Sequence, residues 1–238
     1  MLNAKGVFSG CLFVTLTIAS ATLPGSSMVV AQPAIAQAQL SWKGLIERIL
    51  GRKEPRDGGP SRRGGPRPPD LCWLTPTETV WHNRPTFVWL GGSRLMGVRV
   101  KGEDTVLWQQ VATTNMDATK SSPARYVVTS EAPLPPGNYE WLFFDQTTRS
   151  LQLSVPFQVM DGNQRALITA DLAKLDAKLN ASGTKGDAIA LQRANFFAER
   201  RLWSDGMQEI YAVKKPSAEL QQVAHEIEQE ICASKSVP

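Results

Sequence analysis

The stretch from Leu134 to Phe144 constrains the fold of this chain more than any other. Two prolines and a glycine at 135–137 form a turn that cannot continue a strand ladder, and an aromatic strand follows, with Tyr139, Trp141 and Phe143 at alternate positions. Because successive strand side chains point to opposite faces, these three rings share one face. The pattern predicts a corner at which a strand enters the core of a β-fold.

Short apolar stretches separated by turn residues continue this pattern on both sides of the corner. They predict about seven strands between 71 and 160, at 71–74, 86–90, 95–101, 105–111, 125–129, 139–144 and 151–159. Glycine, serine and proline clusters such as Gly91-Gly92-Ser93 supply the turns between them. Several short strands at this spacing are typical of a two-sheet sandwich.

From Asp161 onward the apolar spacing becomes helical. Ile168, Leu172, Leu175 and Leu179 form one stripe, and further helices are predicted to begin at Asp187, at Ser204 and after Pro216. The expected fold class is therefore α+β in two parts, an antiparallel immunoglobulin-like β-sandwich at 71–160 followed by a small antiparallel helical bundle at 161–238.

The amino-terminal region has the features of an export signal. Lys5 precedes an apolar run from Val7 to Ala21, and Ala34-Ile35-Ala36 forms a small-x-small site, so residues 1–36 are predicted to be a cleaved signal peptide. We expect a periplasmic or extracellular protein without a transmembrane span after cleavage. A short amphipathic helix is expected at 37–50, on a membrane, on a partner or only loosely packed, and 51–70 is expected to be a basic Pro/Gly/Arg linker without fixed structure.

Cleavage of the signal peptide would remove Cys11 and leave two cysteines, Cys72 and Cys232. An even number in an oxidising compartment permits one disulfide, which would tie the start of the folded region to its last helix. Two free buried cysteines are the alternative.

Three resemblances follow from these motifs. The Pro-Pro-Gly-x-Tyr turn is similar to the tyrosine corner of immunoglobulin-like and fibronectin-like sandwiches, in which the tyrosine hydroxyl bonds back to the preceding turn. The stretch from Ala190 to Pro216 weakly resembles one tetratricopeptide-like helix pair. Four motifs together resemble an exported cyanobacterial family classed as a domain of unknown function, of the 928 type: Arg84-Pro85-Thr86-Phe87-Val88-Trp89, Pro-Gly-x-Tyr-x-Trp at 136–141, Pro156-Phe157-x-Val159 and Leu202-Trp203-Ser204-Asp205. This likeness implies export and architecture, but it lends no active-site residues.

The sequence lacks the common catalytic motifs. Its only histidines are His82 and His225, and neither has a second histidine or a cysteine at the short spacing of a zinc site. No nucleophile elbow, phosphate-binding loop or dinucleotide fingerprint occurs outside the predicted signal peptide. We therefore expect no catalytic, cofactor-binding or metal-binding residues, and we interpret both histidines as structural or exposed.

The tryptophans are the strongest indication of a ligand. Trp89, Trp108 and Trp141 alternate with other apolar residues and are expected to fill the core. Trp73 and Trp81 lie nearer to predicted turns, so they are the candidates for stacking on a sugar ring. On the helical half, Phe196, Leu202 and Trp203 are the candidates for contact with a protein partner.

The sequence favours an exported, non-enzymatic structural or adaptor protein of the cell envelope. A protein partner in the envelope is expected, and nucleic acid is not. A glycan-binding module that uses exposed tryptophans is the alternative, and an unrecognised hydrolase is the third hypothesis. An adaptor would expose an apolar patch on the helices, a glycan binder would expose coplanar aromatic rings, and a hydrolase would bring at least two titratable side chains together in a cleft.

Overall fold

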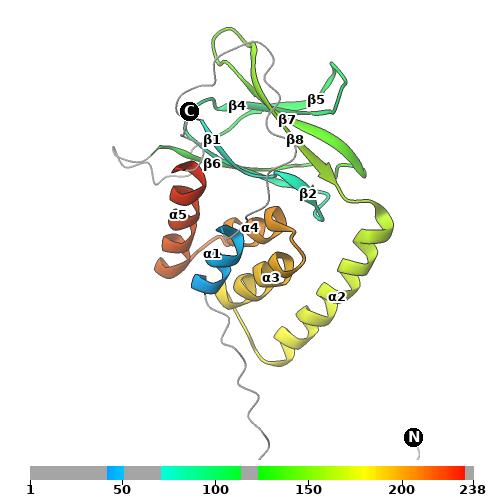
Figure 1. Cartoon of the computed structure of the whole chain (residues 1–238), viewed down its shortest axis with the longest axis vertical. Coiled ribbons are helices and arrows are strands. Elements are labelled where there is room, and N and C mark those ends of the chain that lie inside the picture. Colours follow the sequence, from blue (N-terminus) through cyan, green and yellow to red (C-terminus); the bar gives the residue numbers. More distant parts are fainter. Residues whose placement is uncertain (1–41, 51–70, 114–122, 234–238) are drawn as a thin grey trace, which may run out of the picture. The chain divides into compact units, whose positions relative to one another are not determined.

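Helices and strands are described here for residues 42–50, 71–113 and 123–233 in a computed structural model (Figure 1). The predicted signal peptide, the basic linker and the last five residues lie outside these ranges. The elements in chain order are α1 (Trp42–Leu50), β1 (Cys72–Thr75), β2 (Glu78–Val80), β3 (Thr86–Leu90), β4 (Leu95–Val100), β5 (Val106–Val111), β6 (Arg125–Thr129), β7 (Gly137–Phe144), β8 (Leu151–Val159), α2 (Gly162–Ala181), α3 (Asp187–Glu199), α4 (Trp203–Tyr211) and α5 (Ala218–Ala233).

The strands form two sheets, and the fold class is α+β. One sheet has three antiparallel strands in the order β1-β3-β6, and the other has five strands in the order β2-β8-β7-β4-β5. The prediction of purely antiparallel sheets is wrong at β2, which pairs with β8 in parallel. Strand β2 has only three residues, Glu78 to Val80, and its short length concealed it in the sequence pattern.

An aromatic core lies between the two sheets. Phe87 and Trp89 from β3 and Trp141 and Phe143 from β7 are each completely buried. The rings of Phe87 and Trp141 meet edge to face with centroids 5.2 Å apart, a favourable arrangement for aromatic quadrupoles. Trp108 of β5 is partly buried and packs against the margin of this core, so all three tryptophans predicted to be core residues contact it.

The predicted tyrosine corner is present at the entry to β7. The Tyr139 hydroxyl donates a hydrogen bond of 2.8 Å to the Pro135 carbonyl, and only 4% of the Tyr139 surface is exposed. The bond fixes the proline turn against the strand that it precedes, because a buried hydroxyl needs a partner and the turn carbonyl provides one.

A second apolar core lies on the other side of the three-stranded sheet, where helices α1, α3, α4 and α5 pack (Figure 1). Val88 and Leu90 of β3 face these helices, so both faces of β3 are covered and every residue of the strand is buried. From α1, Leu45 and Ile49 are buried in this second core. The apolar face of α1 therefore packs within the protein rather than on a membrane surface.

The predicted helices are present, with adjusted ends. Asp187 is the first residue of α3 rather than its cap, and its carboxylate accepts a hydrogen bond from the Ser217 amide. Gly183 and Gly186 adopt positive φ angles between α2 and α3, where a side chain would be strained. Among the described residues, no helix combines the length and apolar character that crossing a membrane requires.

Candidate functional site

The densest group of titratable side chains lies where helix α4 meets the segment between β2 and β3. His82 belongs to this segment, and Asp205 and Glu209 lie one helical turn apart on α4. We call these three residues the His82 cluster. The hydrogen bond between His82 and Asp205 joins residues 123 positions apart in the chain.

Asp205 is the centre of the His82 cluster and is fully buried. Its Oδ1 accepts hydrogen bonds from the His82 amide at 2.8 Å and from His82 Nδ1 at 2.7 Å, and its Oδ2 accepts one from the Trp81 amide at 2.8 Å. Because carboxylate oxygens accept hydrogen bonds, the short contact to His82 fits the imidazole tautomer with its proton on Nδ1. Three donors compensate the cost of burying this charge.

Glu209 extends the cluster on the other side of the imidazole. Its Oε1 lies 3.8 Å from His82 Nε2, and its Oε2 lies 3.5 Å from Arg193 Nη1. Arg193 on α3 also lies 3.7 Å from Asp176 on α2. Burial raises the pKa of Glu209, and the positive charges of Arg193 and His82 offset this only in part.

Two polar neighbours on α4 bind the same part of the sheet. Ser204 Oγ accepts a hydrogen bond of 3.0 Å from the Thr77 amide. The Gln208 side chain accepts one of 3.0 Å from the Thr86 amide and donates one of 3.3 Å to the Arg84 carbonyl. One face of α4 therefore supplies side-chain partners for backbone groups from 77 to 86, which the strand ladders do not satisfy.

The imidazole is arranged as in a catalytic dyad, but the group that the described residues place near its second nitrogen is the Glu209 carboxylate rather than a nucleophile. An aspartate at Nδ1 orients a histidine for general-base catalysis when Nε2 faces a nucleophile or a substrate. In the His82 cluster both ring nitrogens face carboxylates, and 19% of the His82 side chain is exposed. Within 71–113 and 123–233, no group of three or more histidine, cysteine, aspartate or glutamate side chains is arranged to hold a metal ion.

The two candidate sugar-stacking tryptophans do not present a ring to solvent together. Trp73 is 6% exposed and belongs to the core between the sheets, so its proposed role in glycan stacking is wrong. Trp81 is partly buried and packs against Phe197 with ring centroids 5.4 Å apart. Its indole N–H lies 3.3 Å from both the Arg165 carbonyl and the Thr169 hydroxyl.

The candidate partner contacts on the helices are also mostly internal. Phe196 and Leu202 are 8% and 6% exposed and pack with Phe197 and Met160. Trp203 is partly buried against the second core. The predicted exposure of Phe196 and Leu202 is therefore wrong, because their side chains fill the interior where the helices pack, and partner contact at Trp203 stays a prediction.

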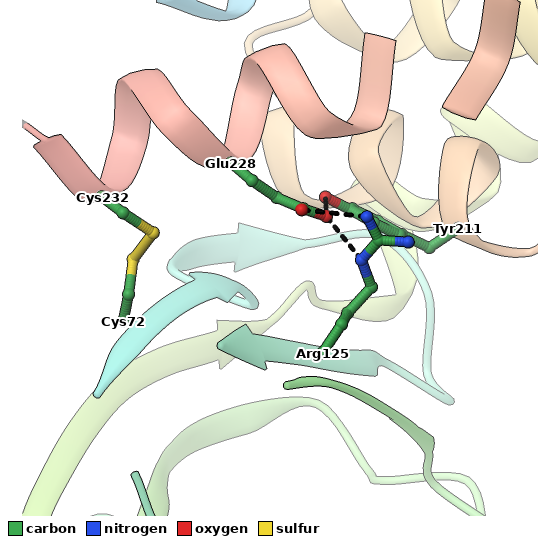
Figure 2. The surroundings of a disulfide bond; sticks show 5 residues. All are labelled: Cys72, Arg125, Tyr211, Glu228 and Cys232. Atoms are coloured by element: carbon green, nitrogen blue, oxygen red, sulfur yellow. Dashed lines mark hydrogen bonds and ion pairs between the residues drawn. A yellow bond between two sulfur atoms is a disulfide. The ribbon is translucent and has the colours of Figure 1, made fainter. Parts of the chain in front are cut away.

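A second polar group lies beside a disulfide (Figure 2). Cys72 of β1 and Cys232 of α5 are bonded, with Cα atoms 5.7 Å apart. Glu228, one turn before Cys232, lies 2.7 Å from Nε of Arg125 on β6 and accepts a hydrogen bond of 3.0 Å from the Tyr211 hydroxyl. Burial, followed by the charge of Glu228, raises the pKa of Tyr211 well above its usual value.

Comparisons with known proteins add no relative. A scan against protein-family models matched none of them, and searches of the curated proteins and of the solved structures found no match either. The assignment of a function therefore depends on the geometry of this chain.

Sequence reasoning missed the His82 cluster. From the sequence, His82 is expected to be structural or exposed, and Asp205 belongs only to the Leu202-Trp203-Ser204-Asp205 motif, because no local pattern connects positions so far apart. The Leu202-Trp203-Ser204-Asp205 motif contained the necessary signal, because it places two polar side chains in the first turn of a helix that is otherwise buried.

Proposed function

We propose that this chain is an exported, non-enzymatic structural or adaptor module of the cell envelope. The observation that carries the proposal is that the His82 cluster joins helix α4 to the β2–β3 segment by hydrogen bonds. Asp205, its most buried charge, has both carboxylate oxygens engaged by the backbone of the β2–β3 segment. A buried carboxylate that is hydrogen-bonded in this way holds two elements together, which supports an architectural role.

The finer architecture is part of this proposal. The hydrogen bond from Tyr139 to Pro135 and the aromatic core between the sheets support an immunoglobulin-like sandwich. The packing of α1 between α3 and α5 supports a helical bundle that covers one sheet. Membership in the exported cyanobacterial family remains a proposal on the motifs that suggested it.

Export is supported by two features that are independent of each other. The amino-terminal residues have the charged start, apolar run and small-residue site of a signal peptide. The disulfide between Cys72 and Cys232 suits the oxidising compartment to which such a signal leads. A periplasmic or extracellular location follows from both.

The adaptor role is tested by isolating the protein from its own envelope after mild cross-linking and identifying by mass spectrometry what accompanies it. One protein partner recovered in independent preparations is the expected result. The matched control is the same preparation without cross-linker, washed at high salt. Glycan without protein, or the chain alone, would contradict the adaptor role.

A hydrolase is the second candidate, and one observation favours it. The His82 cluster brings three titratable side chains together, which is the arrangement expected of a hydrolase site. The test is turnover of ester, peptide and glycoside substrates by the wild type and by His82→Gln. The control is Tyr211→Phe, which lies outside the cluster. If the wild type and Tyr211→Phe turn over a substrate and His82→Gln does not, the protein is a hydrolase and the architectural role is overturned.

A further inference from the structure

Strand β5 is an outer strand of the five-stranded sheet, and β4 is its neighbour. Leu107 and Val111 on β5 are 47% and 53% exposed, and Gln109 between them is exposed as well. Among the described residues, Leu167 on α2 is the one other large apolar side chain with comparable exposure.

The backbone of β5 directs hydrogen-bonding groups away from the sheet. The Ala112 amide donates a hydrogen bond of 2.8 Å to the Arg94 carbonyl, and the ladder continues with the pairs Leu95–Val111, Met96–Gln110 and Gly97–Gln109. Hydrogen-bonded and non-hydrogen-bonded pairs alternate in an antiparallel ladder. The amides and carbonyls of Gln109 and Val111 therefore point away from β4, toward the open edge.

Natural sheets protect such edges with charge, proline, short strands or a covering element. Within the described ranges, the other outer strands carry such protection. Strand β2 has three residues, β1 is tied to α5 by the disulfide, and β6 is tied to α5 by Arg125 and Glu228. Strand β5 has six residues and contains no charge, no proline and no glycine. Its one bulge lies near its start, at Leu107, so the edge from Trp108 to Val111 is regular and unprotected.

We propose that β5 pairs antiparallel with β5 of a second copy of this chain, about a two-fold axis at Gln109. The two five-stranded sheets then continue into one another across the axis. This inference goes beyond the adaptor role and does not depend on it.

The composition of β5 specifies a second copy as the partner. A two-fold axis at Gln109 sets the strand against its own copy, so a strand with charges of one sign would repel itself, and β5 is neutral from Val106 to Val111. The side-chain amide of Gln109 is both donor and acceptor and can bond to its own copy. The same register brings Val111 of each chain next to the bulge at Leu107 of the other, which lowers the exposure of both apolar side chains.

A cysteine at the axis tests the register directly. Residues in a hydrogen-bonded antiparallel pair have Cα atoms about 5.5 Å apart, within the range that a disulfide spans. Under mild oxidation of the full chain, Gln109→Cys is expected to form a covalent dimer on a non-reducing gel. The matched control is Gln158→Cys, an exposed glutamine on β8, which is paired on both sides by β2 and β7.

Sedimentation of the purified full chain tests the interaction without a new cysteine. The wild type is expected to be dimeric, and Gln109→Lys should weaken the dimer by at least about tenfold because it sets two ammonium groups together at the axis. Gln158→Lys, with the same charge added elsewhere on the same sheet, should dimerise as the wild type does, and circular dichroism verifies that both variants are folded. A wild type that stays monomeric at about 0.1 mM, or equal dimerisation by Gln109→Lys, would overturn the proposal.

Discussion

Asp205 shows how one buried side chain can determine where a helix sits. Its carboxylate accepts two backbone amides and one imidazole N–H from the segment before β3. Since a buried charge is costly unless it is fully hydrogen-bonded, this arrangement is stable only while α4 and the β2–β3 segment stay together.

Asp205→Asn is expected to lower the free energy of unfolding by about 3 kcal/mol, because the new amide nitrogen would face a donor and leave buried groups unpaired. Urea denaturation followed by circular dichroism measures the change. Asp176→Asn, at the exposed end of the same chain of charges, should cost less than about 1 kcal/mol. Equal effects of the two substitutions would contradict the special role of Asp205.

Glu209 predicts a pH dependence of stability. Its pKa is raised in the folded protein, so ionisation is harder there than in the unfolded chain. The contribution of Glu209 to the free energy of unfolding is therefore fully present below the pKa of the unfolded chain, near 4.5. It is lost as the pH rises through the higher pKa of the folded state. Glu209→Gln should become progressively more stable relative to the wild type between pH 4 and pH 7, as measured by urea midpoints. Glu230→Gln, at an exposed position on α5, serves as the control and should show no such trend.

At the scale of elements, the turn before β7 depends on one side-chain hydrogen bond. Tyr139→Phe should lower the free energy of unfolding by about 1 kcal/mol, because it removes the bond to Pro135 and leaves the ring in place. Thermal unfolding detects the loss. If Tyr139→Phe unfolds at the wild-type temperature, the corner is not stabilised by this bond.

The elements with a strong period could be predicted from sequence, and those without one could not. The stripe from Ile168 to Leu179 occurs as expected because its apolar residues recur at helical spacing. The strand at 86–90 occurs as expected because it is a short apolar run between Pro85 and Gly91. Strand β2 escaped prediction because three residues are too few to show an alternation. Its parallel pairing with β8 depends on tertiary packing that no local pattern records.

At the scale of the whole molecule, the disulfide closes a long loop, because Cys72 and Cys232 are separated by 160 positions in the sequence. Replacing both cysteines by serine should lower the free energy of unfolding by as much as about 5 kcal/mol. The main reason is that the unfolded chain is no longer cross-linked and gains conformational entropy. Denaturation of the wild type with and without reductant provides the parallel measurement. Identical midpoints in the double variant and the oxidised wild type would contradict this expectation.

The site was harder to predict than the fold. The number of cysteines and the expected compartment permit a disulfide but leave two free cysteines as the alternative, and the candidate surface residues Trp73, Phe196 and Leu202 are buried. An aromatic residue near a turn is exposed only if no other layer covers it. Here the opposite sheet covers Trp73, and the packing of α2 against α3 covers Phe196 and Leu202, and these layers are visible only in three dimensions.

The amides of Trp81 and His82 report most directly on whether the His82 cluster is an architectural clamp. Hydrogen exchange of these two amides should be slow in the wild type and should accelerate on the order of 100-fold in Asp205→Asn, while the amides of β4 keep their protection. Fast exchange in the wild type, or unchanged protection in Asp205→Asn, would contradict the clamp and return His82 to consideration as a reactive group.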